Sequence, residues 1–231
     1  MTLPSTTEPP ATTAGDAGVA VKPLLRGVLH QCSAFVALGA GAVMVATAPT
    51  ARAAWAAAGF AASLVLLFSV SAIYHRVNWP PVARARMRRA DHASIFVLIA
   101  GTYTPLALLG LASEQGNGLL AAVWCGALLG VLKSLLWQNA PKVVAPVLCV
   151  ALGWAVVPYW AEARAGLGDD ALMLVFAGGV VYTIGAICYT LKRPVLWPSL
   201  FGYHEVFHAC TLGGAALHFA AVLQVIHQVR R

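Results

Sequence analysis

Charged residues are scarce in this sequence. Asp, Glu, Lys and Arg together make up 10% of its 231 residues, whereas 60% of the residues are hydrophobic. A soluble domain carries about 25% charged residues, so this composition is not that of an ordinary soluble protein. The formal net charge is +7, but the basic residues lie between apolar segments and form no basic face or RNA-binding motif. The composition therefore predicts an integral membrane protein with no nucleic-acid partner.

Two further signals are absent. The five cysteines lie inside apolar runs and form no CxxC pair, so we interpret them as small apolar side chains rather than as disulfide or metal ligands. Residues 1–20 are rich in Thr, Pro, Ala and Gly, and they lack the basic start and apolar core of a signal peptide. We therefore predict a disordered cytoplasmic tail over residues 1–22 and a membrane domain over residues 23–231.

Long apolar runs are abundant instead. A transmembrane helix needs about 20 apolar residues, and seven segments reach or approach that length. The fifth of them is the least regular, because Pro146 and Pro158 lie inside it. The sequence therefore predicts an all-α integral membrane protein, a bundle of seven transmembrane helices. The predicted spans are 27–48, 53–75, 92–112, 118–138, 143–161, 171–191 and 204–228.

The basic residues between the spans predict how the bundle is oriented. With the N-terminus inside, eleven Lys and Arg residues fall on the inner side and four on the outer side. Because cytoplasmic loops carry an excess of Lys and Arg, we expect a cytoplasmic N-terminus and an external C-terminus in the plasma membrane. The inner group is Lys22, Arg26, Arg76, Arg84, Arg86, Arg88, Arg89, Lys133, Lys142, Lys192 and Arg193, and the outer group is Arg52, Arg164, Arg230 and Arg231.

Polar residues gather at the cytoplasmic ends of three spans. The second span ends with Ser71 and His75, the third begins near Asp91, and the seventh begins with His204 and His208. Counting the spans places all five residues at the same membrane face. Ionisable residues in membrane spans are costly and indicate function by default.

The spacing of these residues predicts a zinc site. His204 and His208 are four residues apart, so both side chains lie on one face of a helix. His75 can supply a third imidazole, and three His ligands with one open position are typical of catalytic zinc. Asp91 can then accept a proton from zinc-bound water, and Ser71 can stabilise a developing oxyanion.

The stretch HEVFH at residues 204–208 also matches the HExxH signature of zinc peptidases, in which the Glu is the base. Those enzymes take a further ligand from later in the chain, but no Asp or Glu follows His208. We therefore expect the third ligand to come from upstream and Glu205 to act at the start of the helix, where a carboxylate is favoured. His218 lies about 15 Å further along the helix, so we interpret it as a buried hydrogen-bonded residue or a cavity lining.

The stretches SAIYHRVNWPPVARARMRRADHASIFVLIAGTYTP and HEVFHACTLGGAALHF closely resemble segments of the hemolysin III family. That family is related to the progestin and adipoQ receptors and, more distantly, to alkaline ceramidases. The resemblance extends over about residues 25–229. It implies a seven-helix fold with zinc near the cytoplasmic face, bound by His75, His204 and His208, with Asp91 holding water and Ser71 as the motif serine.

Three functions stay open at this stage. The first is a zinc-dependent hydrolase that uses zinc-bound water to cleave a lipid amide or ester, so that its partner is a membrane lipid or a lipid-derived substrate. The second is a non-enzymatic, receptor-like membrane sensor with structural zinc. The third is a lytic or pore-forming hemolysin, although the polar residues cluster at one end of the spans rather than along a path through the membrane.

Overall fold

The computed structural model describes residues 23–137, 139–141 and 143–229. The predicted tail, Lys142 and the two C-terminal arginines lie outside the described residues. Within the described residues every regular element is helical, and seven helical segments are long and apolar enough to cross a membrane, which confirms the all-α, seven-helix part of the prediction. The elements are α1 (Val28–Ala46), α2 (Ala51–Arg76), α3 (Pro81–Gly110), α4 (Ser113–Leu136), α5 (Val144–Gly153), the 3-10 turn η1 (Val157–Tyr159), α6 (Trp160–Leu167), α7 (Asp169–Leu191) and α8 (Tyr203–Gln228).

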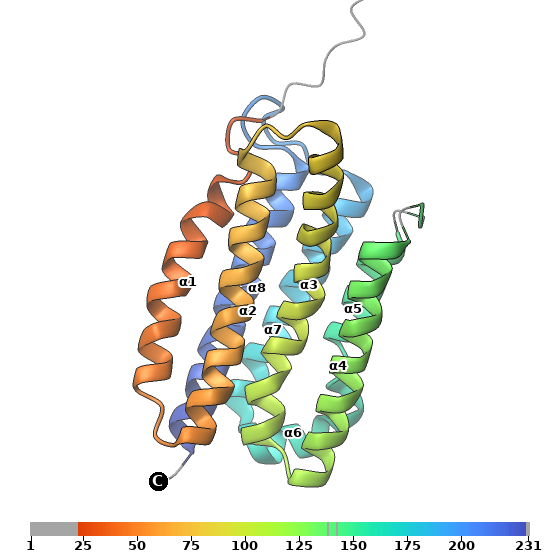
Figure 1. Cartoon of the computed structure of the whole chain (residues 1–231). Helices are drawn as coiled ribbons and strands as arrows, with labels where there is room; N and C mark the ends of the chain where they lie inside the picture. The colour runs from red at the N-terminus through yellow and green to blue at the C-terminus, as the bar shows by residue number, and fades with distance from the viewer. Residues whose placement is uncertain (1–22, 138, 142, 230–231) are drawn as a thin grey trace, which may run out of the picture.

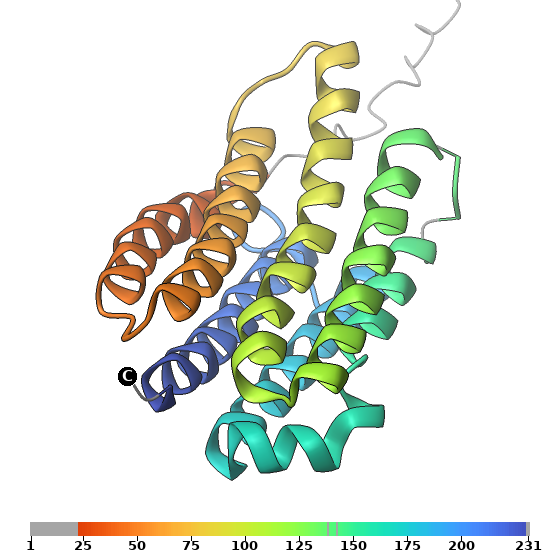
Figure 2. The same cartoon turned by 60° about the horizontal axis from the view of Figure 1, so that its bottom comes forward.

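The helices form one bundle in which chain neighbours pack side by side (Figure 1). The contacts run from α1 to α2, from α2 to α3 and from α3 to α4, while α7 packs along α8. The last helix also contacts α1, α2 and α3, so it lies behind them in the view of Figure 1. The start of α1, the α2–α3 connection and the α7–α8 connection therefore meet at one end of the bundle, and Figure 2 shows the opposite end turned forward.

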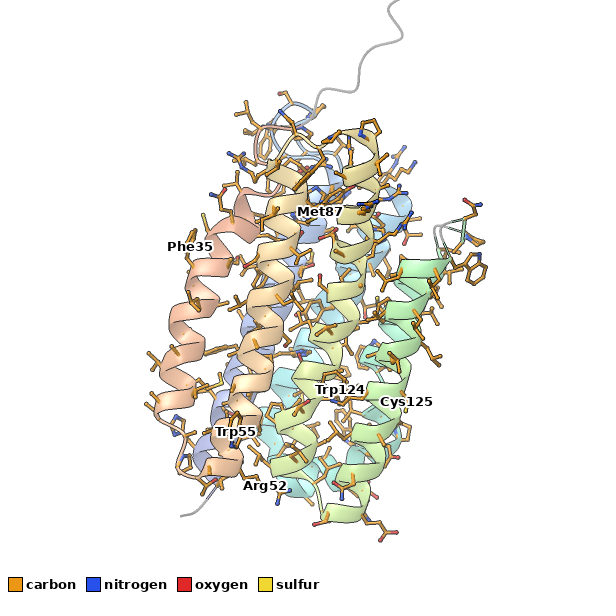
Figure 3. The ribbon with its side chains drawn as sticks, viewed as in Figure 1. Phe35, Arg52, Trp55, Met87, Trp124 and Cys125 are labelled. Atoms are coloured by element: carbon orange, nitrogen blue, oxygen red, sulfur yellow. The ribbon has the colours of Figure 1, made fainter. Side chains whose placement is uncertain are left out.

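The outer surface of the bundle is apolar. Phe35 on α1 is 72% exposed and Trp55 on α2 is 80% exposed, and both point away from the other helices (Figure 3). Large exposed apolar side chains are unfavourable in water, so this surface fits the hydrocarbon of a lipid bilayer. The five cysteines are free thiols, as their isolated positions predict.

Glycines let the central helices approach closely. A Cβ atom on Gly130 of α4 would lie 2.2 Å from the Phe96 ring of α3, and one on Gly101 would lie 2.2 Å from the Ser63 hydroxyl of α2. By contrast, a Cβ atom on Gly118 would meet nothing within 4 Å. Membrane helices associate through such small residues because lipid supplies no hydrophobic driving force between them. These contacts fix α2, α3 and α4 around the site described below.

Two predicted helix starts are wrong. The third span begins at Pro81 rather than near residue 92, and the fourth begins at Ser113 rather than at residue 118. Pro80 is extended, and Pro81 occupies the first turn of α3, where its missing N–H costs nothing. As a result, the arginine-rich stretch that we predicted as a loop forms the first turns of α3.

The fifth span is interrupted. It consists of α5, η1 and α6, so its backbone leaves the α-helix after Gly153. The Tyr103 hydroxyl of α3 donates a hydrogen bond to the Gly153 carbonyl over 2.7 Å and accepts one from the Val156 N–H over 3.0 Å. Irregular backbone at membrane depth is tolerated only where protein or a water-filled cavity satisfies it. Tyr103 therefore stabilises this break, which lies between Pro146 and Pro158 in the span that the sequence marks as the least regular.

Candidate metal centre

Three histidines from two helices meet at the end of the bundle where α1 begins. His75 lies in the last turn of α2, and His204 and His208 lie on one face of the first turns of α8. If one ring nitrogen is taken from each histidine, the three nitrogens all lie within 4.8 Å of one another. Among the described residues, no other group of three or more His, Cys, Asp or Glu side chains is close enough to share an ion.

The spacing of two of these nitrogens fits a tetrahedral metal ion. The Nε2 atoms of His75 and His204 lie 3.1 Å apart. With Zn–N bonds of about 2.0–2.1 Å, two ligand nitrogens on a tetrahedral zinc ion lie about 3.3 Å apart. All three donors are imidazoles, which suit zinc and several other divalent transition metals. The cluster could therefore hold a metal ion, and three donors leave a tetrahedral position open.

Asp91 and Ser71 lie beside the histidines, as the sequence predicts. Asp91 comes from the third turn of α3, and its Oδ2 atom is 3.9 Å from His75 Nε2. Ser71 lies one turn before His75 on α2, within hydrogen-bonding reach of the Asp91 carboxyl group. Both side chains are buried. The structure thus brings all five predicted residues to one place, while their roles stay a prediction.

Glu205 lies between two of the histidines in sequence, but its carboxylate contacts the start of α8 and the segment before α1. Its Oε2 atom accepts a hydrogen bond from the Gly202 N–H over 2.8 Å, which caps the start of α8. Its Oε1 atom forms an ion pair with the Arg26 guanidinium. Both carboxylate oxygens are therefore engaged, and this supports our interpretation of Glu205 as a residue that holds the start of the helix rather than as a base.

Sequence reasoning missed one neighbour of the cluster. His30 of α1 stacks on His208 with ring centroids 3.8 Å apart and an angle of 11° between the rings. Its side chain is buried, and neither ring nitrogen has a hydrogen-bond partner among the described residues. The stack restricts how the His208 ring can turn. A single histidine on an apolar helix carries no local signal of this role, since its partner lies in a distant span.

A cavity of about 470 Å³ extends from the cluster into the bundle. Its wall includes apolar side chains of α2, α3 and α8, such as Leu67, Ile99 and Phe207. Deeper in the bundle it reaches His218, whose Nε2 atom donates a hydrogen bond to the Val175 carbonyl over 3.0 Å. His218 is therefore hydrogen-bonded and lines the cavity, as predicted, but it is half-buried rather than buried. Ligand pockets commonly measure about 300–1,000 Å³, so this volume admits a small amphiphile or part of a lipid.

Comparison with known proteins extends over most of the chain. A family model described as "Haemolysin-III related" matches residues 19–219. "Hemolysin-3" of Bacillus cereus is 30% identical over 204 residues, which cover 87% of this chain and 90% of that protein. "Hemolysin-3 homolog" of Bacillus subtilis (strain 168) is 30% identical over 164 residues, which cover 71% of this chain and 74% of that protein. The matched region includes all eight helices except the end of α8.

Proposed function

Since the chain belongs to the hemolysin III family, we propose that it is a zinc-dependent membrane hydrolase that cleaves a lipid amide or ester. The observation that carries this proposal is the three-histidine cluster, with a buried carboxylate 3.9 Å from one ligand nitrogen. A purely structural tetrahedral site is usually closed by four protein ligands, whereas three ligands are typical of catalytic zinc. The family name alone assigns no reaction.

His75, His204 and His208 would hold the zinc ion. When bound, zinc would supply a Lewis acid that polarises a carbonyl group and lowers the pKa of water. The first two turns of α8 and the last turn of α2 carry the three rings, and the stack of His30 on His208 limits the rotation of one of them. The protein would thus present a preformed set of donors to the metal.

Asp91 is the proposed general base. Its carboxylate takes a proton from the attacking water as the new C–O bond forms, and it returns that proton to the leaving amine or alkoxide as the old bond breaks. Ser71 lies beside Asp91, and its hydroxyl group would donate to the oxyanion that develops on the carbonyl oxygen. The products are a carboxylic acid and an amine or alcohol.

The cavity supplies a binding site for the apolar part of the substrate. Its polar end contains the histidine cluster, and apolar side chains such as Leu67 and Ile99 line its wall. An acyl chain in the cavity would place its head end next to Asp91. The basic residues at this end of the bundle support a plasma-membrane protein whose histidine cluster lies near the cytoplasmic face. In that orientation the N-terminus is inside and the C-terminus is outside.

Metal analysis and hydrolysis assays on the purified protein test this function. We expect about one zinc per wild-type chain, and we expect little zinc in His75→Ala, His204→Ala or His208→Ala. Asp91→Asn should keep the metal but lose cleavage across a panel of ceramides, acyl amides and esters. If zinc-loaded wild type cleaves none of these lipids, the hydrolase proposal fails. If Asp91→Asn also keeps the cellular phenotype, a structural zinc clamp in a sensor explains the cluster.

A further inference from the structure

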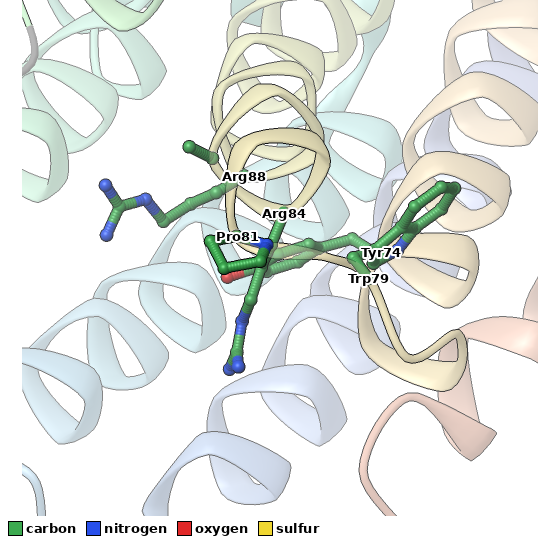
Figure 4. Close-up of a pocket in the computed structure, with 6 residues that line it drawn as sticks. Tyr74, Trp79, Pro81, Arg84 and Arg88 are labelled. Atoms are coloured by element: carbon green, nitrogen blue, oxygen red, sulfur yellow. The ribbon is translucent and has the colours of Figure 1, made fainter.

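A second, shallower pocket lies where α2 turns into α3 (Figure 4). Its volume is about 330 Å³, and it is separate from the proposed hydrolytic chemistry. Tyr74 reaches across from the end of α2 toward the arginines of α3, while Trp79 stands on the α2 side. The lining residues are Tyr74, Trp79, Pro81, Arg84, Ala85 and Arg88.

The pocket concentrates positive charge. Arg84 and Arg88 are four residues apart on α3, so both project from the same face of the helix. Among the described residues, neither arginine forms an ion pair with a carboxylate. Like charges at this spacing repel each other. An anion bound between them would remove that repulsion and accept hydrogen bonds from both guanidinium groups.

The aromatic side chains give the pocket a fixed wall and an additional donor. The Trp79 indole N–H donates a hydrogen bond to the Ile73 carbonyl over 3.2 Å, which anchors the ring to the last turn of α2. The Tyr74 hydroxyl makes no hydrogen bond to another described side chain or to the described backbone, so it is available to a ligand. Tyr and Trp are also enriched at the level of lipid headgroups.

The pocket adjoins the cavity of the metal centre. Tyr74, Arg84 and Arg88 line both volumes. Tyr74 directly precedes His75, and their rings lie 4.5 Å apart between centroids. A group bound to the two arginines would therefore sit at the mouth of the deeper cavity, with the apolar wall of that cavity beyond it.

We infer that this arginine pocket binds the phosphate group of an anionic phospholipid and directs its acyl chain into the adjoining cavity. Two guanidinium groups and a phenol suit a phosphate, because arginine matches phosphate geometry through paired hydrogen bonds. The position of the pocket at the end of the bundle matches the depth of a headgroup. Binding itself does not depend on hydrolysis, whereas the assignment of such a lipid as the substrate rests on the proposed function.

The chain offers a matched control for this inference. Arg86 lies between the two arginines in sequence and carries the same charge, but it lines neither volume. Replacing any one of the three by glutamine removes one positive charge from the same helix. The effect on how the protein is oriented in the membrane should therefore be the same for all three variants. A difference between Arg86→Gln and the other two variants therefore reports on the pocket rather than on overall charge.

The experiment measures binding of a fluorescent short-chain phosphatidic acid to full-length protein in phosphatidylcholine nanodiscs. An attraction of about 1 kcal/mol between a pocket arginine and the bound anionic lipid corresponds to about fivefold in binding. We therefore expect Arg84→Gln and Arg88→Gln to weaken binding at least about fivefold. Arg86→Gln should change it less than about twofold. Tyr74→Phe should weaken binding as well, and because it changes only one hydroxyl group it guards against misfolding of the arginine variants.

Three results would overturn the inference. If Arg86→Gln weakens lipid binding as much as the two pocket variants do, the effect comes from the overall positive charge and not from the pocket. Equal binding of a fluorescent phosphatidylcholine would remove the preference for an anionic lipid. Competition by inorganic phosphate at the concentration of the lipid itself would assign the pocket to free phosphate. Measuring both lipid binding and lipid cleavage separates the two proposals. If the wild type binds the lipid but never cleaves it, the hydrolase proposal is refuted and the pocket stands. If Asp91→Asn binds the lipid as the wild type does, binding does not depend on the proposed base.

Discussion

The ion pair between Arg26 and Glu205 gives the sharpest test of how the metal centre is built. It joins the segment before α1 to the first turn of α8, and it spans 179 residues of sequence. The two partners differ in exposure, since the Arg26 side chain is 21% exposed and that of Glu205 only 1%. Removing one partner therefore has a different consequence from removing the other.

Arg26→Met leaves a buried carboxylate that keeps only the Gly202 N–H as a partner. Breaking a buried ion pair from one side costs about 3–5 kcal/mol, and the partial exposure of Arg26 favours the lower limit of about 3 kcal/mol. Glu205→Gln is milder, because the amide oxygen still accepts the Gly202 N–H and the arginine can reach water. We expect a cost of about 1–2 kcal/mol for that change. The double variant should be about as stable as Glu205→Gln alone, because no unpaired buried charge remains.

Thermal unfolding of the four proteins in one detergent tests this order. A loss of 1 kcal/mol lowers the Tm of a chain of this size by about 2–4 °C, so Arg26→Met should unfold about 6–12 °C below wild type. A metal titration on the same samples should show weaker binding in Arg26→Met, since the first turn of α8 carries His204. The reasoning is refuted if Glu205→Gln is the more damaging single change, or if the losses of the two single variants simply add in the double variant.

Three further changes probe the bundle and the cluster. Gly130→Ala places a methyl group into the ring packed on this glycine, so we expect a lower Tm, whereas Gly118→Ala in the same helix meets open space and should leave the Tm equal or higher. Tyr103→Phe removes the hydroxyl that bridges the interrupted fifth span, and a loss of about 1–3 kcal/mol should appear as faster hydrogen exchange there. His30→Phe keeps a ring stacked on His208 and should retain metal affinity, whereas equal loss in His30→Phe and His30→Ala would contradict a stacking role.

The number of spans and the meeting of Ser71, His75, Asp91 and the two α8 histidines could be predicted from the sequence. Apolar length identifies each crossing, and the parity of the crossings places the ends of three spans at the same face. The i, i+4 spacing of His204 and His208 then selects one face of a helix. These steps need no tertiary information, because helices that cross a membrane run nearly parallel and each begins or ends at one of two faces.

The arginine pocket could not be predicted in the same way. Hydropathy starts the third span only after the arginines, so the sequence predicts a loop over residues 84–89. The structure continues α3 through them to Pro81, and the helical spacing places Arg84 and Arg88 on one side and Arg86 on another. Pro81 was an available signal, because proline is common at the first position of a helix. It marks a helix start only if the charged stretch that follows it is helical.

Contacts between distant segments explain the other misses. Arg26 has His30 at i+4 and His30 has Ser33 at i+3, but neither spacing points to α8. Their roles come from α8, which lies against α1 at the end of the bundle. Such pairings depend on which helices are neighbours, and a list of spans does not contain that information.

In the proposed function, the depth of the polar groups would connect the candidate metal centre to a lipid substrate. The three clustered histidines lie in the last turn of α2 and the first two turns of α8, so the cluster sits just below the end of the bundle. In a lipid, the amide or ester bond joins the headgroup to the acyl chains and occupies a similar depth. If the proposed function holds, the arginine pocket would lie at headgroup level and the cavity, which has apolar side chains in its wall, at acyl level. This order suits an enzyme that acts on a lipid in place, whereas a wide aqueous pore would need polar side chains along the whole length of the bundle.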